Sequence, residues 1–422
     1  MNVLILGSGG REHAIAWKLS QSKKISHIFI GPGNAGTADT GTNIKIDPDN
    51  FEDVRKAVTE NNIDMVVVGP EAPLAGGIHD FFLGESQLKR IPVIGPVKSA
   101  AQLEGSKDFA KSFMTRHGIP TAEYRSFGKT DYHKALEYIR TLKPPYVLKA
   151  DGLAAGKGVV IHSSYDDAAK DLEAMFNGKF GRAGEKVIIE KFLKGIELSV
   201  FIITDGRSYK LLPSAKDYKR AEEGDKGLNT GGMGAISPVP FADAYFMNKV
   251  KKRIIEPTLG GLASEGIVYK GFIFFGLINV NGDPFVIEYN ARLGDPESEA
   301  IIPRIKSDLF ELLEGVAMED LAERTIEIDE RYVSTVMLVS GGYPGNYSKG
   351  MEISGIEKTE GCVVFHAGTG KEGTRTLTSG GRVLAVSSWG HTLEEALRGS
   401  YSNAGRISFE GMYYRKDIGF DL

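Results

Sequence analysis

A short run near residue 290 carries the side chains best suited to chemistry in this sequence. Val286 to Glu297 begins as an apolar strand and ends in polar groups. Side chains two apart on a strand share a face, so Glu288 and Asn290 are predicted to point the same way. Two oxygen ligands that leave room for water and phosphate suit Mg²⁺. Arg292, two residues on, can clamp a carboxylate or stabilise charge on a transferring phosphoryl group.

A glycine-rich loop between Lys149 and Gly158 is the second candidate. Lys149 ends an apolar strand, and Lys157 lies among glycines and alanines. Two ammonium groups beside exposed backbone amides could hold the phosphates of ATP. Gly158 stands where a Walker loop needs serine or threonine, so a lid-like hairpin is expected instead. The alternative is a glycine hairpin with solvated lysines.

The next apolar strand, 187 to 193, ends in an acid and an aromatic residue. Backbone at such an edge could recognise adenine, and an acid could accept hydrogen bonds from ribose hydroxyls. A core strand with surface acids would look the same. The predicted nucleotide contacts here are Glu190, Lys191, Phe192, Leu193 and Glu197.

Two further segments suggest a polar substrate site. Gly7 to His13 is a glycine turn between a strand and a helix, where free N–H groups and the helix dipole suit a phosphate. A dinucleotide fingerprint would need glycine at Glu12, so that class is disfavoured. Ser214 to Arg220 and Asn229 to Gly234 combine charge with a glycine nest. A tight turn and a solvated loop are the respective alternatives.

The elements that position these groups fall into three parts. Short apolar runs alternate with helical stretches up to residue 101, which predicts βαβ units and a parallel, Rossmann-like sheet. A mixed α+β body follows, and from residue 329 short strands dominate, with one helix at Leu393 to Ala404. We therefore expect an α/β and α+β multidomain protein with domains at 1–102, 103–328 and 329–422.

Composition excludes several other classes. The 422 residues carry a net charge of −4, which gives no basic field for nucleic acid. The one cysteine, Cys362, cannot form an intrachain disulfide, so a reducing, cytoplasmic setting is expected. The eight histidines form no zinc-protease spacing, and no serine nucleophile elbow occurs. No apolar run reaches the roughly 20 residues that span a bilayer.

Taken together, these motifs resemble an ATP-grasp enzyme, and more narrowly the phosphoribosylamine-glycine ligase family. The resemblance runs from end to end and includes Gly69 to Leu74, Ser340 to Gly345, Phe365 to Thr369 and Tyr414 to Gly419. It implies an ATP-grasp core with a mobile lid at about 123–190 and a small, mostly-β C-terminal cap. A monofunctional enzyme of bacterial type is also implied.

The family resemblance implies the second step of purine biosynthesis. ATP, glycine and 5-phosphoribosylamine would give ADP, phosphate and glycinamide ribonucleotide through a glycyl phosphate. Mg²⁺ or Mn²⁺ would be the cofactor, on Glu288 and Asn290, and Lys107 would join the ATP contacts. A monomer is expected, with transient contact to the preceding amidotransferase and with neither nucleic acid nor membrane as partner.

The same resemblance assigns the remaining site residues. Catalytic roles fall to Arg292, Asp217 and Lys219, and the amine substrate is assigned to Gly10, Asn34, Glu71 and Gly294. The sequence departs from the family pattern nearby. Lys216 replaces a glutamine, Tyr218 a histidine and Leu228 a common proline.

Other functions remain open on the sequence alone. A different carboxylate-amine ligase, or a carboxylase that uses bicarbonate, would share the nucleotide site. A nicotinamide-dependent oxidoreductase would explain the first glycine turn but not the Lys149 loop. A nucleotide sensor without catalysis would not need Glu288, Asn290 and Arg292 to converge.

Overall fold

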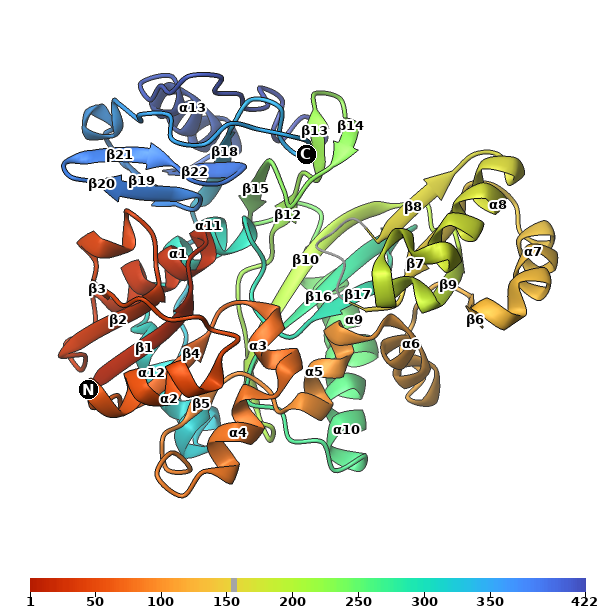
Figure 1. Ribbon diagram of the computed structural model, residues 1–422, viewed down its shortest axis with the longest axis horizontal. Coiled ribbons are helices and arrows are strands. Elements are labelled where there is room, and N and C mark those ends of the chain that lie inside the picture. Colours follow the sequence, from red (N-terminus) through yellow and green to blue (C-terminus); the bar gives the residue numbers. More distant parts are fainter. Residues whose placement is uncertain (153–157) are drawn as a thin grey trace.

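A computed structural model describes residues 1–152 and 158–422 of the chain. It contains three large bodies, and the 124–191 unit projects to one side (Figure 1). The α/β and α+β class expected from the sequence is confirmed.

The N-terminal body is a five-stranded parallel sheet of order β3-β2-β1-β4-β5. Its strands are β1 (Asn2–Gly7), β2 (His27–Pro32), β3 (Thr42–Asn43), β4 (Met65–Val68) and β5 (Val93–Ile94). The helices include α1 (Gly10–Leu19), α2 (Phe51–Glu60), α3 (Glu71–Gly76), α4 (Ile78–Gly84) and α5 (Lys98–Gly105). β1 pairs with β2 on one side and β4 on the other. The strand order therefore reverses at β1, and ligands of such sheets bind at that carboxyl end, where the Gly7 turn lies.

The central body is built on an antiparallel sheet of order β11-β10-β16-β17. The strands are β10 (Ile196–Thr204), β11 (Tyr209–Leu211), β16 (Gly271–Val280) and β17 (Asp283–Asn290). Helices α6 (Lys107–Arg116), α9 (Ala244–Val250) and α10 (Glu256–Ser264) share a core with it. The register of β16 with β17 shifts between Gly276 and Leu277, opposite Glu288 and Val286. This bulge lies immediately before Glu288, and a bulge re-aims the side chain that follows it.

Residues 124–191 form a unit with its own sheet, β6-β9-β7-β8, and its own apolar core. The elements are β6 (Tyr124–Gly128), α7 (Tyr132–Thr141), β7 (Tyr146–Ala150), β8 (Val159–His162), α8 (Tyr165–Ala174) and β9 (Lys186–Lys191). β7 and β8 pair as an antiparallel hairpin. The carboxyl end of β7, at Lys149, faces the central body.

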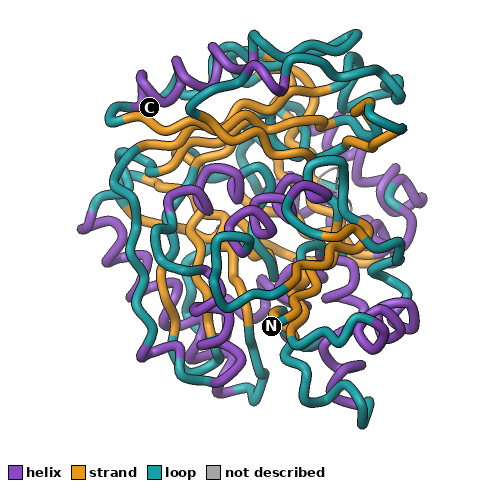
Figure 2. Tube along the Cα trace, turned by 90° about the vertical axis from the view of Figure 1, so that its left-hand side faces the viewer, coloured by secondary structure: helices purple, strands orange, loops and turns teal. Residues whose placement is uncertain are grey.

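The third sheet, β12-β15-β18-β22-β19, crosses the sequence-based domain division at 328/329. β12 (Lys216–Asp217) and β15 (Gly234–Ser237) come from before it, and β18 (Tyr332–Val339), β19 (Cys362–His366) and β22 (Arg382–Gly390) from after it. Helix α13 (Leu393–Ala404) covers the outer face of this sheet (Figure 2). The chain segment around Asp217 is thereby anchored to the C-terminal part.

Two short helices connect the bodies. α11 (Glu297–Ile301) packs between α1 and the third sheet, and α12 (Leu309–Met318) lies near the N-terminal sheet. None of the helices in the described ranges is long and apolar enough to cross a membrane.

Candidate active site

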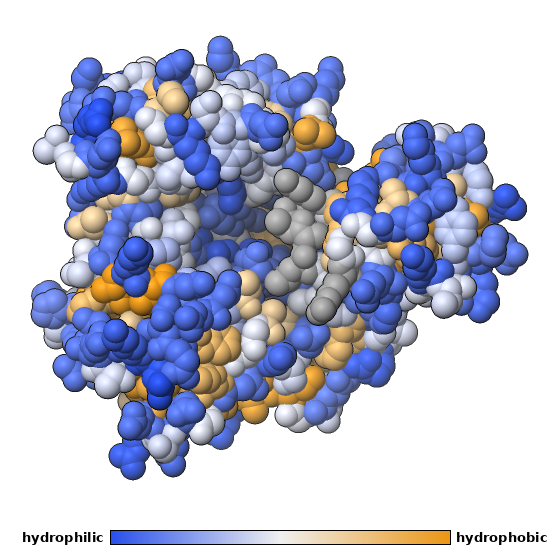
Figure 3. Space-filling view, in the orientation of Figure 1, coloured by the Kyte–Doolittle hydropathy of each residue, from blue (hydrophilic) through white to orange (hydrophobic). Residues whose placement is uncertain are grey.

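The hollow between the three bodies has a hydrophilic floor (Figure 3). One wall is the turn that starts α1. The backbone N–H of Gly9 donates to Glu12 Oε2 at 2.6 Å, and Arg11 Nε lies 2.7 Å from Glu12 Oε1. Arg11 also donates to the carbonyl of Leu293 at 3.0 Å. Burial disfavours its charge, yet Glu12 and nearby acids raise the pKa of Arg11 above its ordinary value. Glu12 and Arg11 therefore stabilise the turn through their own hydrogen bonds.

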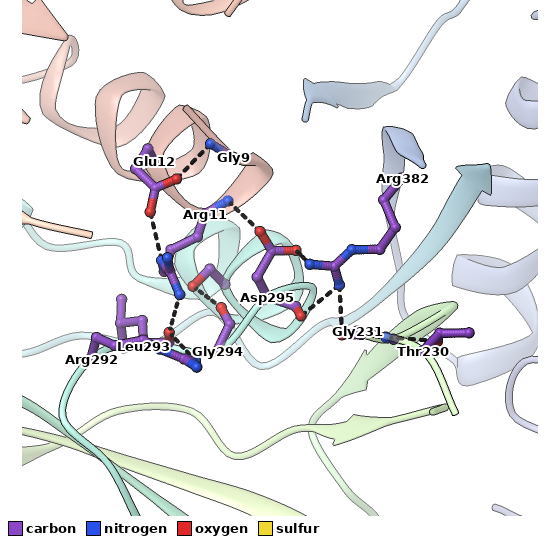
Figure 4. Close-up of polar contacts among 12 residues, drawn as sticks. Gly9, Arg11, Glu12, Thr230, Gly231, Arg292, Leu293, Gly294, Asp295 and Arg382 are labelled. Atoms are coloured by element: carbon purple, nitrogen blue, oxygen red, sulfur yellow. Dashed lines mark hydrogen bonds and ion pairs between the residues drawn. The ribbon is translucent and has the colours of Figure 1, made fainter. Parts of the chain in front are cut away.

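A second arginine ties this wall to the C-terminal part (Figure 4). Arg382 of β22 lies 3.0 Å from Asp295 Oδ1 and donates to the carbonyls of Asp295 and Gly231 at 2.8 and 2.6 Å. Asp295 in turn accepts a 3.4 Å bond from the N–H of Arg11. Burial opposes ionisation of Asp295, but Arg382 and Arg11 hold its pKa below the ordinary value. Three chain segments thus meet at one carboxylate.

Arg292 follows β17 and turns toward the N-terminal body. Its Nη2 lies 2.9 Å from Glu104 Oε1, and its Nε lies 3.6 Å from Glu71 Oε2. Burial raises the pKa of Glu104, whereas Arg292 and Arg11 outweigh burial and lower that of Glu71. Nε of Arg292 is buried without a hydrogen-bond partner among the described residues. Arg292 is therefore held between two acids of the N-terminal body.

Near the carboxyl end of β7, two lysines converge on Glu190. Lys149 Nζ and Lys111 Nζ lie 3.0 and 3.1 Å from the same oxygen of Glu190, and all three side chains are buried. Burial alone would raise the pKa of Glu190, but the lysines lower it. Burial lowers the pKa of Lys111 to about 8. Lys149 and Glu190, both predicted to bind ATP, therefore lie together.

Lys107 lies beside this cluster. Its Nζ donates to the carbonyl of Gly152 at 3.1 Å, and burial lowers its pKa although Glu288 opposes the shift. The predicted site residue Lys157 falls outside the described residues. Phe192 follows β9 and is 37% exposed, so an aromatic face is open to a flat ligand.

Acids and a lysine form the floor next to β17. Lys219 Nζ lies 3.2 Å from Glu197 Oε2 and 4.0 Å from Asp217 Oδ2. These three residues, with Glu288, line a small pocket. Asp217 raises the pKa of Lys219 well above its ordinary value, and burial raises that of Asp217. The predicted catalytic pair Asp217 and Lys219 is thus adjacent to the predicted metal ligand Glu288.

Glu288 and Asn290 are both partly exposed, while Tyr289 between them is buried. Their donor chemistry fits a hard cation that keeps water and phosphate oxygens as its other ligands. Groups of three or more histidine, cysteine or acidic side chains able to hold a metal ion do not occur in residues 1–152 or 158–422. Glu288 and Asn290 therefore fit a cation brought in with a phosphate ligand, not a closed protein site.

Two predicted substrate residues have structural contacts in the protein. Asn34 donates to the carbonyls of Ser8 and His366 at 2.9 and 2.7 Å and accepts the N–H groups of Gly36 and Thr37. Its side chain thus fixes the glycine turn, and a direct substrate contact stays a prediction. Gly294 leaves room for the Glu297 carboxylate, which a Cβ at that position would strike.

Two of the three departures from the family pattern, Lys216 and Tyr218, contact the C-terminal residues. Lys216 Nζ lies 3.1 Å from Asp421 Oδ2, and the Tyr218 hydroxyl donates to Asp421 Oδ1 at 2.9 Å. Successive side chains of a strand alternate faces, so Asp217 and Lys219 keep the opposite side. Lys216 and Tyr218 therefore fasten the loop to the C-terminal residues.

Three family models cover almost the whole chain. The N domain of phosphoribosylglycinamide synthetase matches residues 1–104, its ATP-grasp (A) domain 105–298 and its C domain 333–421. A phosphoribosylamine–glycine ligase of Chlorobaculum tepidum is 46% identical over 99% of each chain. The chain belongs to the phosphoribosylglycinamide synthetase family.

Solved structures agree with this membership. The phosphoribosylamine–glycine ligase of Thermotoga maritima superposes with a TM-score of 0.86 at 37% identity, over 99% of this chain and 100% of that one. The biotin carboxylase domain of a Hydrogenobacter thermophilus 2-oxoglutarate carboxylase has a TM-score of 0.71 at 18% identity, over 98% and 91%. That second likeness shows the ATP-grasp fold alone. The sequence-based identification of the phosphoribosylglycinamide synthetase family is confirmed.

Within this family fold, sequence reasoning missed four side chains of the site. Lys111 lies on α6 with no motif around it, and Arg382 reaches Asp295 across 87 residues of sequence. Glu104 accepts a hydrogen bond from the backbone N–H of Ala291, which lies 187 residues later in the sequence. Glu297 ends the motif that begins at Val286, and its carboxylate was the one feature of the sequence that could have indicated a role in the site.

Proposed function

We propose that the chain joins glycine to 5-phosphoribosylamine, using ATP and releasing ADP and phosphate. The observation that carries this proposal is the convergence of three bodies on one hollow. In this hollow, the α1 turn offers an anion site, Lys107, Lys149 and Phe192 offer a nucleotide site, and Asp217, Lys219 and Glu288 line a small pocket. A carboxylate, an amine and ATP can meet there.

ATP would lie against the 124–191 unit. The backbone edge at 191–193 and the Phe192 ring would contact the base, and Glu197 the ribose. Lys149 and Lys107 would contact the phosphates. Because Lys149 now pairs with Glu190, a phosphate would compete for that ammonium group or share it.

Glu288 and Asn290 would hold Mg²⁺ or Mn²⁺. When bound, the cation would neutralise charge on the phosphate oxygens. Support comes from their partial exposure on one strand and from the bulge that precedes Glu288. ATP-grasp enzymes generally use a divalent metal ion. That this ion is Mg²⁺ or Mn²⁺ is part of the proposal.

The first chemical step forms glycyl phosphate. A carboxylate oxygen of glycine attacks the γ-phosphorus, the bond to the β,γ-bridging oxygen breaks, and ADP leaves. Both reactants are anions, so cationic side chains must lower their repulsion. Arg292 supplies a guanidinium group beside Glu104 and Glu71, and Asp217 and Glu197 keep Lys219 charged by raising its pKa. We assign the carboxylate and phosphoryl contacts to these two groups.

The second step forms the amide. The amine nitrogen attacks the acyl carbon, the carbon–oxygen bond to phosphate breaks, and the nitrogen loses a proton. We assign the acceptance of that proton to Glu297. Burial and the neighbouring Asp217 raise the pKa of Glu297 to about 7, and Ser199 holds its Oε1 at 3.0 Å. A carboxylate that titrates near neutral pH suits proton transfer.

The phosphoribosyl group would lie at the α1 turn. Gly10 and the first N–H groups of α1 would receive its phosphate, and Glu71 its hydroxyls. Arg11 bonds Glu12 through Nε and the Leu293 carbonyl through Nη1, so we assign to it the support of the turn. Asn34 and Gly294 would shape the same subsite.

The wider setting is proposed on less direct support. The single cysteine supports a cytoplasmic location. We also propose a monomer that receives its unstable amine from the preceding amidotransferase by transient contact. The domains would be 1–102, 103–328 with a lid at about 123–190, and 329–422.

The test is ADP release by the purified chain with ATP, Mg²⁺ and glycine, with and without phosphoribosylamine generated in place from ribose 5-phosphate and ammonia. Turnover that requires both glycine and the amine is expected. Turnover with bicarbonate in place of glycine would favour a carboxylase and contradict the proposal. ATP binding without turnover under any pairing would favour a sensor.

A further inference from the structure

Glu299 on α11 is a buried acid with no role in the reaction described above. It is 0% exposed, and neither carboxylate oxygen has a hydrogen-bond partner within residues 1–152 and 158–422. Oδ1 of Asp295, its acidic neighbour, has the ion pair with Arg382 at 3.0 Å but no hydrogen bond among the described residues. An ionised carboxylate left this way would strongly destabilise the fold. Two ionised acids side by side are therefore not the stable state.

One added proton removes the buried charge of Glu299 and supplies one hydrogen-bond donor between the two acids. We propose that Glu299 is a neutral carboxylic acid that donates a hydrogen bond to ionised Asp295, and that this pair positions the α1 turn for the phosphate of the amine substrate. The proposal rests on the proposed function only in its last clause. Glu299 is then a positioning residue, because it acts through Asp295 and the turn.

The proton belongs to Glu299 because the cations favour Asp295. Arg382 lies 3.0 Å from Asp295 Oδ1, and the N–H of Arg11 donates to its Oδ2 at 3.4 Å. Glu299 has no such donor within the described ranges. Burial and the negative Asp295 raise the pKa of Glu299 well above its ordinary value, in agreement with this arrangement.

The other elements packed on α11 bring no competing cation. The strand β15 and residues 333–339 of β18 contain no ionisable side chain. Arg304, just after α11, directs its guanidinium to Ser237 and to the carbonyls of Asp329 and Arg331. Arg11 of α1 directs its own to Glu12 and the Leu293 carbonyl. Arg382 is therefore the cation that this acid pair shares.

The link to substrate is the contact between Glu299 and Gly10. A Cβ at Gly10 would collide with Glu299 Oε1, so this oxygen lies against the first residue of α1. Helix N-termini attract anions through their free N–H groups and dipole. A charged Glu299 would occupy that field from behind, whereas a neutral one leaves it to the substrate phosphate.

The first test needs no substrate. Infrared difference spectra of the full chain against Glu299→Gln, at neutral pH and without ligand, should show a protonated carboxyl band lost in the variant. Loss of carboxylate bands alone would overturn the proposal. Failure of the proposed ligase activity would not affect this result.

The second test compares Glu299→Gln with Glu299→Leu in titrations with glycinamide ribonucleotide, the stable product. Glutamine keeps a neutral N–H donor, so its affinity should stay within about threefold of the native chain. Leucine loses the donor and should weaken binding about tenfold. A larger loss in the glutamine variant, or equal binding by both variants, would overturn the positioning role. Should the leucine variant not fold, the infrared result and the glutamine variant decide.

Discussion

Two sides of the site hold their charges differently. At the α1 turn, Arg11 and Arg382 each bond a carboxylate and backbone carbonyls from other segments. On the nucleotide side, Lys149 and Lys111 share one oxygen of Glu190. Carbonyl partners are fixed by the fold, whereas ion pairs between side chains can exchange. We therefore expect the proposed amine subsite to be assembled before ligand arrives, and the lysines of the proposed nucleotide subsite to exchange Glu190 for a triphosphate.

The largest effect is expected where the two sides meet, at Arg292. Arg292→Ala should reduce turnover about a thousandfold or more, because the lost cation would stabilise charge that develops in phosphoryl transfer. ATP affinity should stay within about threefold, since the nucleotide cations are elsewhere. Steady-state kinetics and an equilibrium ATP titration measure both quantities.

Arg292→Lys is the matched control, because it keeps charge near Glu104 but loses the planar fork. Thermal melts should accompany both variants, as an uncompensated buried Glu104 destabilises the fold. A large loss of ATP affinity in a folded Arg292→Ala would contradict the role given to this residue.

The second-largest effect is expected from acid, which should lower the stability of the contact between α1 and the C-terminal part. His366 donates its backbone N–H to His13 Nδ1 at 2.8 Å across the seam of the N- and C-terminal parts. Burial lowers the pKa of His13 from 6.5 to about 3 and that of His366 to about 4. Because the unfolded chain binds protons first, this stability is complete above pH 6.5 and is lost as pH falls toward 4 and 3.

We expect the free energy of unfolding to fall by roughly 2–4 kcal/mol between pH 6.5 and about 5 through these two groups. Urea unfolding at several pH values measures it. His13→Asn should flatten the dependence, and a change at exposed His133 should not. Equal slopes in both variants would refute the assignment.

A smaller effect is expected on the exchangeable side. Lys149→Met should raise the dissociation constant for ATP on the order of thirtyfold, the loss of one charge-assisted contact of about 2 kcal/mol. The KM for phosphoribosylamine should change little. Lys111→Met removes the other partner of Glu190 but lies further into the core, so ATP should weaken less. Equal losses in both variants would mean that Glu190 orientation, not direct contact, sets ATP affinity.

The smallest effect concerns the fastening of the Asp217 loop. Asp421→Ala frees both Lys216 and Tyr218, so the KM for the amine should rise about three- to tenfold with ATP affinity unchanged. Initial rates at varied amine concentration measure this. Asp417→Ala, which releases Arg415 nearby, controls for general loosening of the C-terminal residues. An unchanged KM would show that the loop holds its shape without Asp421.

Local pattern predicted much of this architecture. The alternation of apolar runs predicted the parallel sheet, and period two placed Glu288 and Asn290 together, because both signals depend on near neighbours in sequence. The helix expected at Leu393 to Ala404 has those same bounds. The glycine turn at Gly7 lies at the carboxyl end of β1, where the sheet order reverses.

Contacts between residues far apart in the sequence could not be predicted. Arg382 with Asp295, and Glu104 with Arg292, depend on how separate bodies dock, which no local period encodes. The sequence division at 328/329 likewise ignores that β15 and β18 pair in one sheet. The contacts of Asn34 could not be predicted from the sequence either. An asparagine suits a ligand contact, but the hydrogen bonds of its side chain go to backbone groups of the protein.

The central claim is that glycine passes through an acyl phosphate in this hollow. Glycine labelled with ¹⁸O in its carboxylate tests it, with mass analysis of the phosphate released during turnover with ATP and phosphoribosylamine. We expect one labelled oxygen in each phosphate, because the bridging oxygen of glycyl phosphate leaves with phosphorus. Unlabelled phosphate beside newly formed glycinamide ribonucleotide would contradict the acyl phosphate and the roles built on it.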